Sequence, residues 1–220
     1  MIRVKICGIT TVEDARMASE AGADALGFNF YQQSPRSVSV EMAVQIAHAI
    51  PADVVRVGVF VNETVQSIRR VVEQVGLDQV QLHGDEPPEF LANFVDVSLI
   101  RAFRCRDEGW GPVQSYLEQC TKQNVTPAAV LLDAYSANSY GGTGHRLDWH
   151  MVADRERSIG DMPTLLAGGL NPDNVGDAIT IARPTGVDVA SGVETEPGIK
   201  SKELVTRFVN ASRRAFENPQ

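Results

Sequence analysis

The chain lacks the features that mark several protein classes. Its 220 residues include only three cysteines, Cys7, Cys105 and Cys120, and no CxxC spacing, which argues against a disulfide framework or a zinc site. A net charge of −8 argues against a general nucleic-acid-binding surface, because such surfaces neutralise phosphates with Lys and Arg. No apolar run approaches the roughly 20 residues that a membrane helix requires. We expect free thiols, no nucleic-acid partner and no membrane span.

The start of the chain also lacks a basic leader or an apolar signal segment, because Val4 already belongs to the first strand-like run. We therefore expect a cytoplasmic protein. No low-complexity linker interrupts the sequence, and 43% hydrophobic residues suffice for one sizeable core. We expect a single domain over residues 1–220.

Apolar, strand-like runs alternate with amphipathic, helix-like stretches. We predict strands at about 2–7, 23–28, 54–61, 79–82, 97–102, 128–133, 164–167 and 186–189. We predict helices at about 12–21, 40–50, 65–75, 87–94, 111–122, 148–154, 174–182 and 202–215. Thr11 is expected to cap the start of the first helix, while Gly22 and Gly76 are expected to end the first and third.

This alternation indicates parallel strands joined by right-handed crossovers. The rival architecture is an open, dinucleotide-binding sheet, but no GxGxxG motif opens the first unit. Eight consecutive units favour closure, so we predict an α/β protein with the (β/α)8 TIM-barrel fold. Its functional groups should then lie just after the strands.

Cys7 and Asp133 each end an apolar run and are followed at once by turn-forming sequence. A thiol and a carboxyl in these places can divide proton transfer, one accepting while the other donates. Partial burial would favour the protonated Asp133, which can donate. The alternatives are that Cys7 is a small core residue and that Asp133 caps the next turn.

An ordinary thiol, with a pKa of about 8.5, is only slightly ionised at neutral pH. Lys5 precedes Cys7 by two residues, so both side chains project to one face of the strand, and the ammonium would favour a thiolate. Cys105 and Cys120 lack such a setting and are expected to be structural. Asp188 lies within a strand and either hydrogen-bonds a sugar hydroxyl or contacts a side chain of a neighbouring strand.

Two small-residue pairs, Gly168-Gly169 and Ser191-Gly192, follow the seventh and eighth predicted strands. Glycines expose backbone N–H groups without an obstructing Cβ, so these loops can form a phosphate cradle. Such a cradle needs no basic surface, which fits the acidic composition. One glycine pair alone would be better explained as a tight turn, but two pairs in adjacent loops favour phosphate binding.

Three further observations concern charged and metal-binding groups. Arg36 follows Ser34-Pro35 in the loop after the second strand and either holds a second anion, such as a carboxylate, or faces water. His83 lies at the expected barrel mouth as a minor site residue or as a structural hydrogen-bonding group. No histidine has the carboxylate-rich spacing of a metal site, so we expect no metal.

Six motifs span nearly the whole chain. They are Lys5-Ile6-Cys7-Gly8-Ile9-Thr10, Gly27-Phe28-Asn29-Phe30 with Ser34-Pro35-Arg36, Gln81-Leu82-His83-Gly84, Leu132-Asp133 with Gly141-Gly142-Thr143-Gly144, Ala167-Gly168-Gly169-Leu170-Asn171-Pro172, and Val187-Asp188-Val189-Ala190-Ser191-Gly192-Val193-Glu194. In this order the motifs resemble those of the phosphoribosylanthranilate isomerase family. The resemblance implies a (β/α)8 barrel that performs an Amadori rearrangement in tryptophan biosynthesis, without a metal or an organic cofactor.

Position by position, the resemblance implies that Cys7 is the general base and Asp133 the general acid. It also implies that Arg36 holds the anthranilate carboxylate of a small-molecule phosphosugar substrate. The implied phosphate-binding residues are Gly168, Gly169, Ser191 and Gly192. The other implied substrate-binding residues are Lys5, His83, Gly142, Gly144 and Asp188. Either a monomer or a homodimer is compatible with the sequence.

The chain departs from the family pattern at Asn29, where an apolar residue is usual, and at Ala190, which replaces a common serine. The second change removes one side-chain hydrogen bond near the phosphate. Two rival functions remain. A histidine-pathway isomerase would be expected to use two strand-end aspartates, and Cys7 argues against it. A barrel kept only for binding would have no reason to keep both proton-transfer groups and both anion sites.

Overall fold

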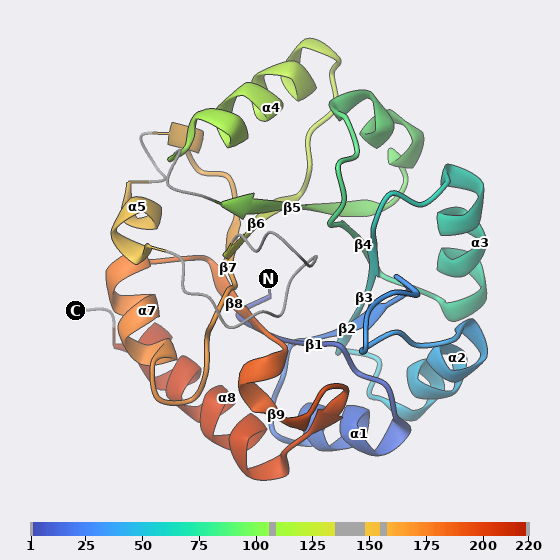
Figure 1. Ribbon diagram of the computed structural model, residues 1–220, viewed down its shortest axis with the longest axis vertical. Coiled ribbons are helices and arrows are strands. Elements are labelled where there is room, and N and C mark those ends of the chain that lie inside the picture. The colour runs from blue at the N-terminus through green and yellow to red at the C-terminus, as the bar shows by residue number, and fades with distance from the viewer. Residues whose placement is uncertain (1, 106–108, 135–147, 155–157, 219–220) are drawn as a thin grey trace.

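Short runs rich in Val, Leu, Ile and Ala form eight parallel strands, which pair in sequence order and close into a barrel where β1 pairs with β8. The computed structural model describes residues 2–105, 109–134, 148–154 and 158–218. Helices surround the ring of strands (Figure 1). The predicted (β/α)8 TIM barrel is therefore confirmed.

The barrel strands lie close to their predicted positions. They are β1 (Val4–Cys7), β2 (Ala25–Asn29), β3 (Val55–Phe60), β4 (Gln79–Leu82), β5 (Ser98–Cys105), β6 (Ala129–Ala134), β7 (Thr164–Leu166) and β8 (Gly186–Val189). The β5 strand continues beyond its predicted end at residue 102 because Phe103, Arg104 and Cys105 pair with β6. This pairing brings the ends of β5 and β6 together.

The helices also follow the predicted order. They are α1 (Val12–Glu20), α2 (Val40–Ala49), α3 (Val65–Val75), η1 (Pro88–Phe94), α4 (Gly111–Lys122), α5 (Trp149–Ala153), α7 (Val175–Ala182) and α8 (Lys202–Glu217). The η1 segment is a 3₁₀-helix and not the regular helix that its pattern suggested. The segment is only seven residues long, and short segments favour the tighter helix. Among the described residues, no helix is long and apolar enough to cross a membrane.

The predicted helix ends are present. The Thr11 side chain accepts a hydrogen bond from the backbone N–H of Asp14 at 3.1 Å and caps α1. Gly22 follows the end of α1 with φ +97°. Gly76 ends α3 with φ +69°, the left-handed conformation that glycine adopts without strain.

The hydrophobic core has two parts. The larger cluster contains buried residues from strands and helices, such as Ile6, Leu26 and Phe208. The smaller cluster contains Ala25, Val57, Ile100, Ala102, Leu131, Leu165 and Ala167 from strands and their ends. Because alternate residues of a strand face opposite sides, we assign the smaller cluster to the barrel interior. Asp133, two residues after Leu131, lies on the same face of β6.

The loop after β8 contains structure that was not predicted. It forms a short 3₁₀-helix, η2 (Ser191–Val193), and an antiparallel hairpin of β9 (Glu194–Glu196) and β10 (Ile199–Lys200). Gly198 lies in the turn with φ +87°. The Thr10 hydroxyl donates to the carbonyl of Gly198 at 2.6 Å. The hairpin is therefore attached to the loop that follows β1.

Candidate active site

Lys5 and Cys7 of β1 face a carboxylate on the neighbouring strand. Lys5 is fully buried and pairs in register with Asp188 of β8. Its Nζ donates a hydrogen bond to Asp188 Oδ1 at 2.8 Å, and the Cys7 thiol lies close enough that its charge raises the pKa of Lys5. Of the two interpretations of Asp188, the contact with a neighbouring strand's side chain is therefore present.

The protonation states of this cluster follow from burial and charge. Burial alone would lower the pKa of Lys5, but the charges of Asp188 and Cys7 outweigh burial and raise it. Burial raises the pKa of Cys7 above its ordinary value, the Lys5 ammonium opposes this, and the Asp188 carboxylate adds to it. The predicted influence of Lys5 thus has the right direction, but burial outweighs it.

Gly27 of β2 makes room for this cluster. A Cβ at position 27 would lie 2.7 Å from Cys7 Sγ and 3.1 Å from Lys5 Nζ. Both distances are shorter than side-chain carbons normally tolerate, so a larger residue would displace the thiol or the ammonium. Gly27 belongs to one of the six sequence motifs, but no role was predicted for it.

On β6, Asp133 lies beside His83, which directly follows β4. His83 Nε2 is 3.5 Å from Asp133 Oδ2, and both side chains are largely buried. Gln81, also buried, places its Nε2 3.2 Å from His83 Nδ1. The structure therefore brings His83 and Asp133 together, and it adds Gln81, whose role had not been predicted.

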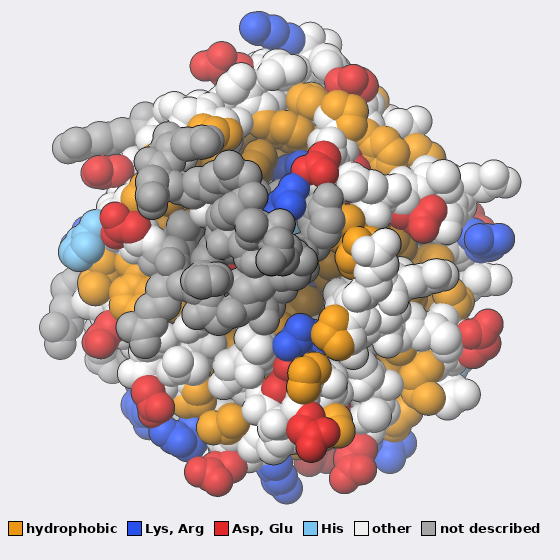
Figure 2. Space-filling model, viewed as in Figure 1, with side chains coloured by type: hydrophobic (Ala, Val, Ile, Leu, Met, Phe, Trp, Pro, Cys, Tyr) orange, Lys and Arg blue, Asp and Glu red, His pale blue; other side chains and the backbone are white. Residues whose placement is uncertain are grey.

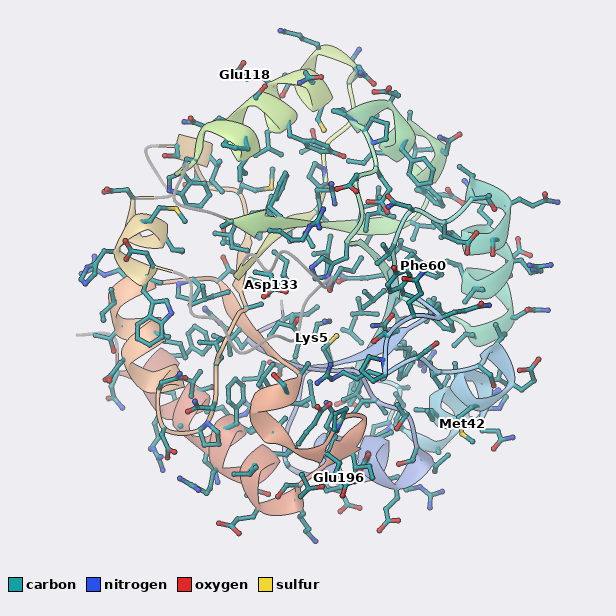
Figure 3. All side chains as sticks on the ribbon, in the orientation of Figure 1. Lys5, Met42, Phe60, Glu118, Asp133 and Glu196 are labelled. Atoms are coloured by element: carbon teal, nitrogen blue, oxygen red, sulfur yellow. The ribbon has the colours of Figure 1, made fainter. Side chains whose placement is uncertain are left out.

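The two predicted proton-transfer groups, Cys7 and Asp133, come from different parts of the barrel wall. Cys7 lies on β1 and Asp133 on β6, and the strands β7 and β8 separate them around the ring. Both Lys5 and Asp133 lie within the ring of strands when the molecule is viewed as in Figure 3. Lys or Arg side chains are visible near the centre of the face drawn in Figure 2, with Asp or Glu close by, and both signs of charge are spread around its rim. An anionic ligand can therefore meet local positive charge on an acidic protein.

Arg36, in the loop after β2, is largely buried and does not simply face water. Its guanidinium forms a bidentate ion pair with Glu194 of β9, with the shortest contact, from Nη2 to Oε2, at 2.7 Å. Lys200 of β10 binds the same carboxylate at 2.6 Å. Lys200 was not among the predicted site residues. Glu194 belongs to one of the six sequence motifs, but no role was predicted for it.

The glycine loops after β7 and β8 are in contact. Gly168 and Gly169 have φ values of +81° and +67°, which favour glycine. A Cβ on Gly192 would lie 1.9 Å from the carbonyl oxygen of Leu170, so only glycine allows this approach. The Asn174 side chain donates to the Gly169 carbonyl at 2.9 Å and braces the first loop.

The remaining predicted site residues are Ser191, Gly142 and Gly144. Ser191 begins η2, within the loop after β8. Gly142 and Gly144 lie outside the described residues. Among the described residues, no group of three or more His, Cys, Asp or Glu side chains is arranged to hold a metal ion. Cys105 and Cys120 are buried, and burial raises the pKa of Cys105 to about 12, as expected for structural thiols.

The arrangement can support proton transfer on an anionic ligand. Cys7, as a thiolate, can accept a proton, while Asp133 can donate one from another part of the barrel wall. The described glycine loops offer backbone N–H groups, and the guanidinium of Arg36 offers a cation for a second acidic group.

Comparison with known proteins gives a consistent result. Residues 4–211 match the family model described as N-(5'phosphoribosyl)anthranilate (PRA) isomerase. The chain is 45% identical over 214 residues to N-(5'-phosphoribosyl)anthranilate isomerase of Geobacter metallireducens, covering 97% of this chain and 100% of the relative.

Solved structures agree with this match. The phosphoribosyl anthranilate isomerase of Thermotoga maritima is similar with a TM-score of 0.84 and 38% identity, over 97% of this chain and 100% of that one. A phosphoribosyl anthranilate isomerase in complex with reduced 1-(o-carboxyphenylamino)-1-deoxyribulose 5-phosphate is similar with a TM-score of 0.80 and 38% identity, with the same coverage.

Proposed function

The chain belongs to the N-(5'-phosphoribosyl)anthranilate isomerase family, and from this premise we propose how its residues divide the reaction. The protein is an aldose–ketose isomerase of tryptophan biosynthesis. It converts N-(5'-phosphoribosyl)anthranilate to 1-(2-carboxyphenylamino)-1-deoxyribulose 5-phosphate. The roles of individual residues below are our proposal.

Asp133 acts as the general acid. It protonates the furanose ring oxygen, the bond from that oxygen to C1′ breaks, and the aminal opens to a Schiff base. The positive nitrogen of the Schiff base then acidifies the proton on C2′. Burial of Asp133 and its position beside His83 support this role.

Cys7 acts as the general base. As a thiolate it removes the C2′ proton, and the resulting enolamine tautomerises to the ketone product. Lys5 supports the thiolate because the charge of its ammonium lowers the pKa of Cys7. Asp188 keeps that ammonium in place through the 2.8 Å contact.

The other groups hold the two ends of the substrate. Arg36 binds the anthranilate carboxylate, and the backbone of Gly168, Gly169, Ser191 and Gly192 binds the phosphate. Anchoring both ends fixes the reacting carbons between base and acid, where positioning lowers the barrier. Gly142 and Gly144 remain predicted substrate contacts.

One observation carries this proposal. The closed barrel gathers a thiol–ammonium pair on β1, the Asp133–His83 pair and two touching glycine loops at the ends of its strands. A barrel that only binds a ligand has no need of both a proton acceptor and a proton donor in these places. The proposed chemistry therefore depends on the proton acceptor, the proton donor and the glycine loops together, and not on any one of them alone.

The test is a coupled fluorescence assay. Anthranilate, phosphoribosyl pyrophosphate and the coupling transferase generate the substrate, and the decay of fluorescence reports its isomerisation when this protein is added. We expect decay well above the uncatalysed rate. If the decay stays at the uncatalysed rate, the protein does not isomerise this substrate, and the proposed roles of the residues are overturned.

Four wider predictions accompany the proposal. We propose that the small-molecule substrate is turned over in the cytoplasm by one catalytic domain spanning residues 1–220. We expect either a monomer or a homodimer. We also expect that the reaction proceeds without metal or organic cofactor, since the two side chains supply both proton transfers.

A further inference from the structure

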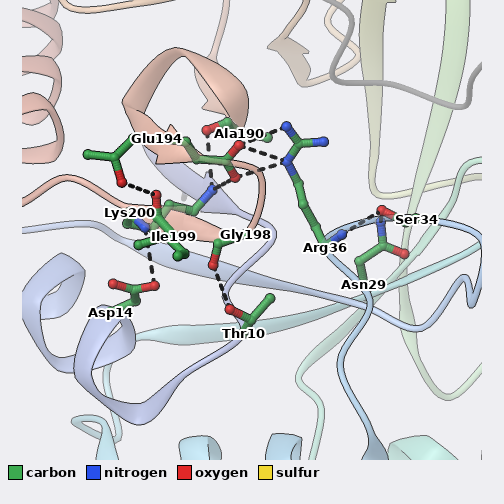
Figure 4. Close-up of polar contacts among 11 residues, drawn as sticks. Thr10, Asp14, Asn29, Ser34, Arg36, Ala190, Glu194, Gly198, Ile199 and Lys200 are labelled. Atoms are coloured by element: carbon green, nitrogen blue, oxygen red, sulfur yellow. Dashed lines mark hydrogen bonds and ion pairs between the residues drawn. The ribbon is translucent and has the colours of Figure 1, made fainter.

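A second cluster of buried charges lies beside the loop that follows Cys7, where a Cβ on Gly8 would lie 2.7 Å from the Arg36 side chain. Glu194 accepts hydrogen bonds from Arg36 and from Lys200 (Figure 4). The side chains are 4%, 12% and 0% exposed for Glu194, Arg36 and Lys200, so water screens their charges only weakly. The proton-transfer steps described above do not use Glu194 or Lys200.

The β9–β10 hairpin creates this cluster. Its register places Lys200 opposite Glu194, so the two side chains meet. The Lys200 backbone N–H donates to Asp14 at 3.2 Å, and its Nζ donates to the Ala190 carbonyl at 3.2 Å. The hairpin thus joins α1 and the loop after β8 to the Arg36 loop, which makes the position of the cluster well defined.

The geometry of the ion pair leaves one edge of Arg36 open. Glu194 contacts Nε at 2.9 and 3.1 Å and Nη2 at 2.7 Å, and so occupies the Nε–Nη2 edge of the guanidinium. Nη1 makes no hydrogen bond to any part of the chain that the structure describes. A carboxylate can therefore bind end-on through Nη1 and the second hydrogen of Nη2.

The charges of the cluster decide how strongly that edge attracts an anion. Arg36 paired only with Glu194 would be a neutral pair with little attraction for a second carboxylate. Lys200 adds a positive charge, so the three side chains together carry a net charge of +1. Burial alone would raise the pKa of Glu194, but hydrogen bonds from Arg36 and the charge of Lys200 outweigh burial and lower it, which keeps the carboxylate ionised.

We propose that Glu194 and Lys200 are positioning residues that determine specificity for the substrate's carboxylate. Glu194 fixes the guanidinium with its free edge available, and Lys200 neutralises Glu194 so that Arg36 keeps its positive charge for the ligand. The inference rests on the proposed function, in which Arg36 receives the anthranilate carboxylate.

The test compares Lys200→Met, Glu194→Gln and the double variant. The probes are the substrate, the reduced 1-(o-carboxyphenylamino)-1-deoxyribulose 5-phosphate, and the same reduced compound without the carboxyl group. Lys200→Met should raise KM by about 10-fold or more, as expected for loss of ground-state attraction, with a smaller fall in kcat because the Lys200 ammonium also lowers the pKa of Cys7. Affinity should fall for the carboxylate probe and stay unchanged for the probe without it.

The double variant separates charge from packing. It carries the same net charge as the unmutated cluster, so it should bind the carboxylate probe more tightly than Lys200→Met does. Lys200→Arg should also retain most of the affinity. If Lys200→Met does not fold, the double variant, which removes both charges of the Lys200–Glu194 pair, provides the comparison with the unmutated protein. It should show a raised KM because Arg36 loses its carboxylate partner and is less firmly held.

Several outcomes would overturn the inference. One is an unchanged KM in Lys200→Met. If Lys200→Met does not fold, an unchanged KM in the double variant has the same meaning. Another is an equal loss of affinity for both probes, which indicates general damage to the site. An unmutated protein that turns over no substrate would instead overturn the proposed function, and this inference with it. If the unmutated protein is active and Lys200→Met has an unchanged KM, this inference alone is overturned.

Discussion

At the scale of single residues, the site balances opposing effects on one thiol. Burial and the Asp188 carboxylate raise the pKa of Cys7, while the ammonium groups of Lys5 and Lys200 lower it. The net result is a raised pKa, so most of the free protein holds Cys7 as a thiol at neutral pH. The proposed proton abstraction by Cys7 therefore depends on a minor thiolate population or on a fall in the pKa of Cys7 when substrate binds.

The first prediction concerns the two proposed proton-transfer groups. Cys7→Ala and Asp133→Asn should each reduce kcat by at least ~10²-fold, the low end for the loss of a general acid or base. The measurement is steady-state turnover in the fluorescence assay. Circular dichroism and thermal unfolding serve as the control, and both variants should fold. Near-normal turnover in either variant would remove that residue from its role.

The second prediction concerns the ionisation of Cys7. Because the folded protein raises the pKa of Cys7, its alkylation by iodoacetamide should accelerate with pH, with a midpoint above the ordinary thiol value of about 8.5. In Asp188→Asn a charge that raises this pKa is absent, so the midpoint should move to lower pH. Mass spectrometry of the labelled peptide measures the rate.

Cys7→Ser is the control for this experiment. Cys105 and Cys120 are buried with raised pKa values, so this variant should label slowly across the same pH range. A midpoint below the ordinary thiol value in the unmutated protein would show that the ammonium groups outweigh burial, contrary to the structure.

Sequence alone could place the strand-end residues but could not identify every partner. Cys7 and Asp133 follow apolar runs, and the period of two in a strand puts Lys5 beside Cys7. The ion pair of Arg36 with Glu194 joins residues far apart in the chain, and no local pattern encodes such a contact. The balance between burial and charge at Cys7 likewise requires the folded surroundings.

At the scale of secondary-structure elements, β2 approaches β1 closely enough that one methyl group matters. The third prediction is that Gly27→Ala lowers kcat by about 10-fold or more, because its Cβ would lie 2.7 Å from Cys7 Sγ. The measurement is kcat together with the thermal midpoint of unfolding.

Gly176→Ala is the matched control. Gly176 lies in α7, and a Cβ there would meet nothing within 4 Å among the neighbours that the structure describes. This change should leave kcat unaltered and stabilise the protein by about 0.5–1 kcal/mol, because alanine favours helix more than glycine does. Equal effects of the two substitutions on kcat would contradict the proposed role of the Cys7–Gly27 contact.

The β9–β10 hairpin was the main element missed in the sequence. Its turn, Pro197-Gly198, is a turn signal of the ordinary kind, but strands of three and two residues are too short for periodicity to detect. Regular strand–helix alternation, by contrast, predicted the barrel units because each carries a long periodic pattern. At η1, the consecutive prolines signalled a helix start but not its 3₁₀ form.

At the scale of the whole molecule, closure of the barrel builds the site. β1 and β8 come from opposite ends of the sequence, yet their pairing brings Lys5 beside Asp188. The same closure carries the hairpin after β8 to the Arg36 loop after β2. The alternation of elements predicted this closure, but the register that places Lys5 opposite Asp188 depends on the packing of the complete ring.

The fourth prediction follows from this arrangement. The proposed ligand contacts come from loops at both ends of the chain, so bound ligand should stabilise the whole barrel as one cooperative unit. At a concentration of the reduced product about 100 times its Kd, the free energy of unfolding should rise by about 2.7 kcal/mol. For a domain of this size, that corresponds to a rise in Tm of roughly 5–10 °C.

Differential scanning calorimetry, with Kd measured separately by titration, checks this prediction and tests the proposed single domain. One transition that moves as a whole is expected, because closure makes β1 and β8 unfold together. Arg36→Ala, which removes the proposed carboxylate contact, should give a smaller shift at the same ligand concentration since its Kd is higher. Two transitions, of which the ligand moves only one, would mean that the barrel does not unfold as a single unit.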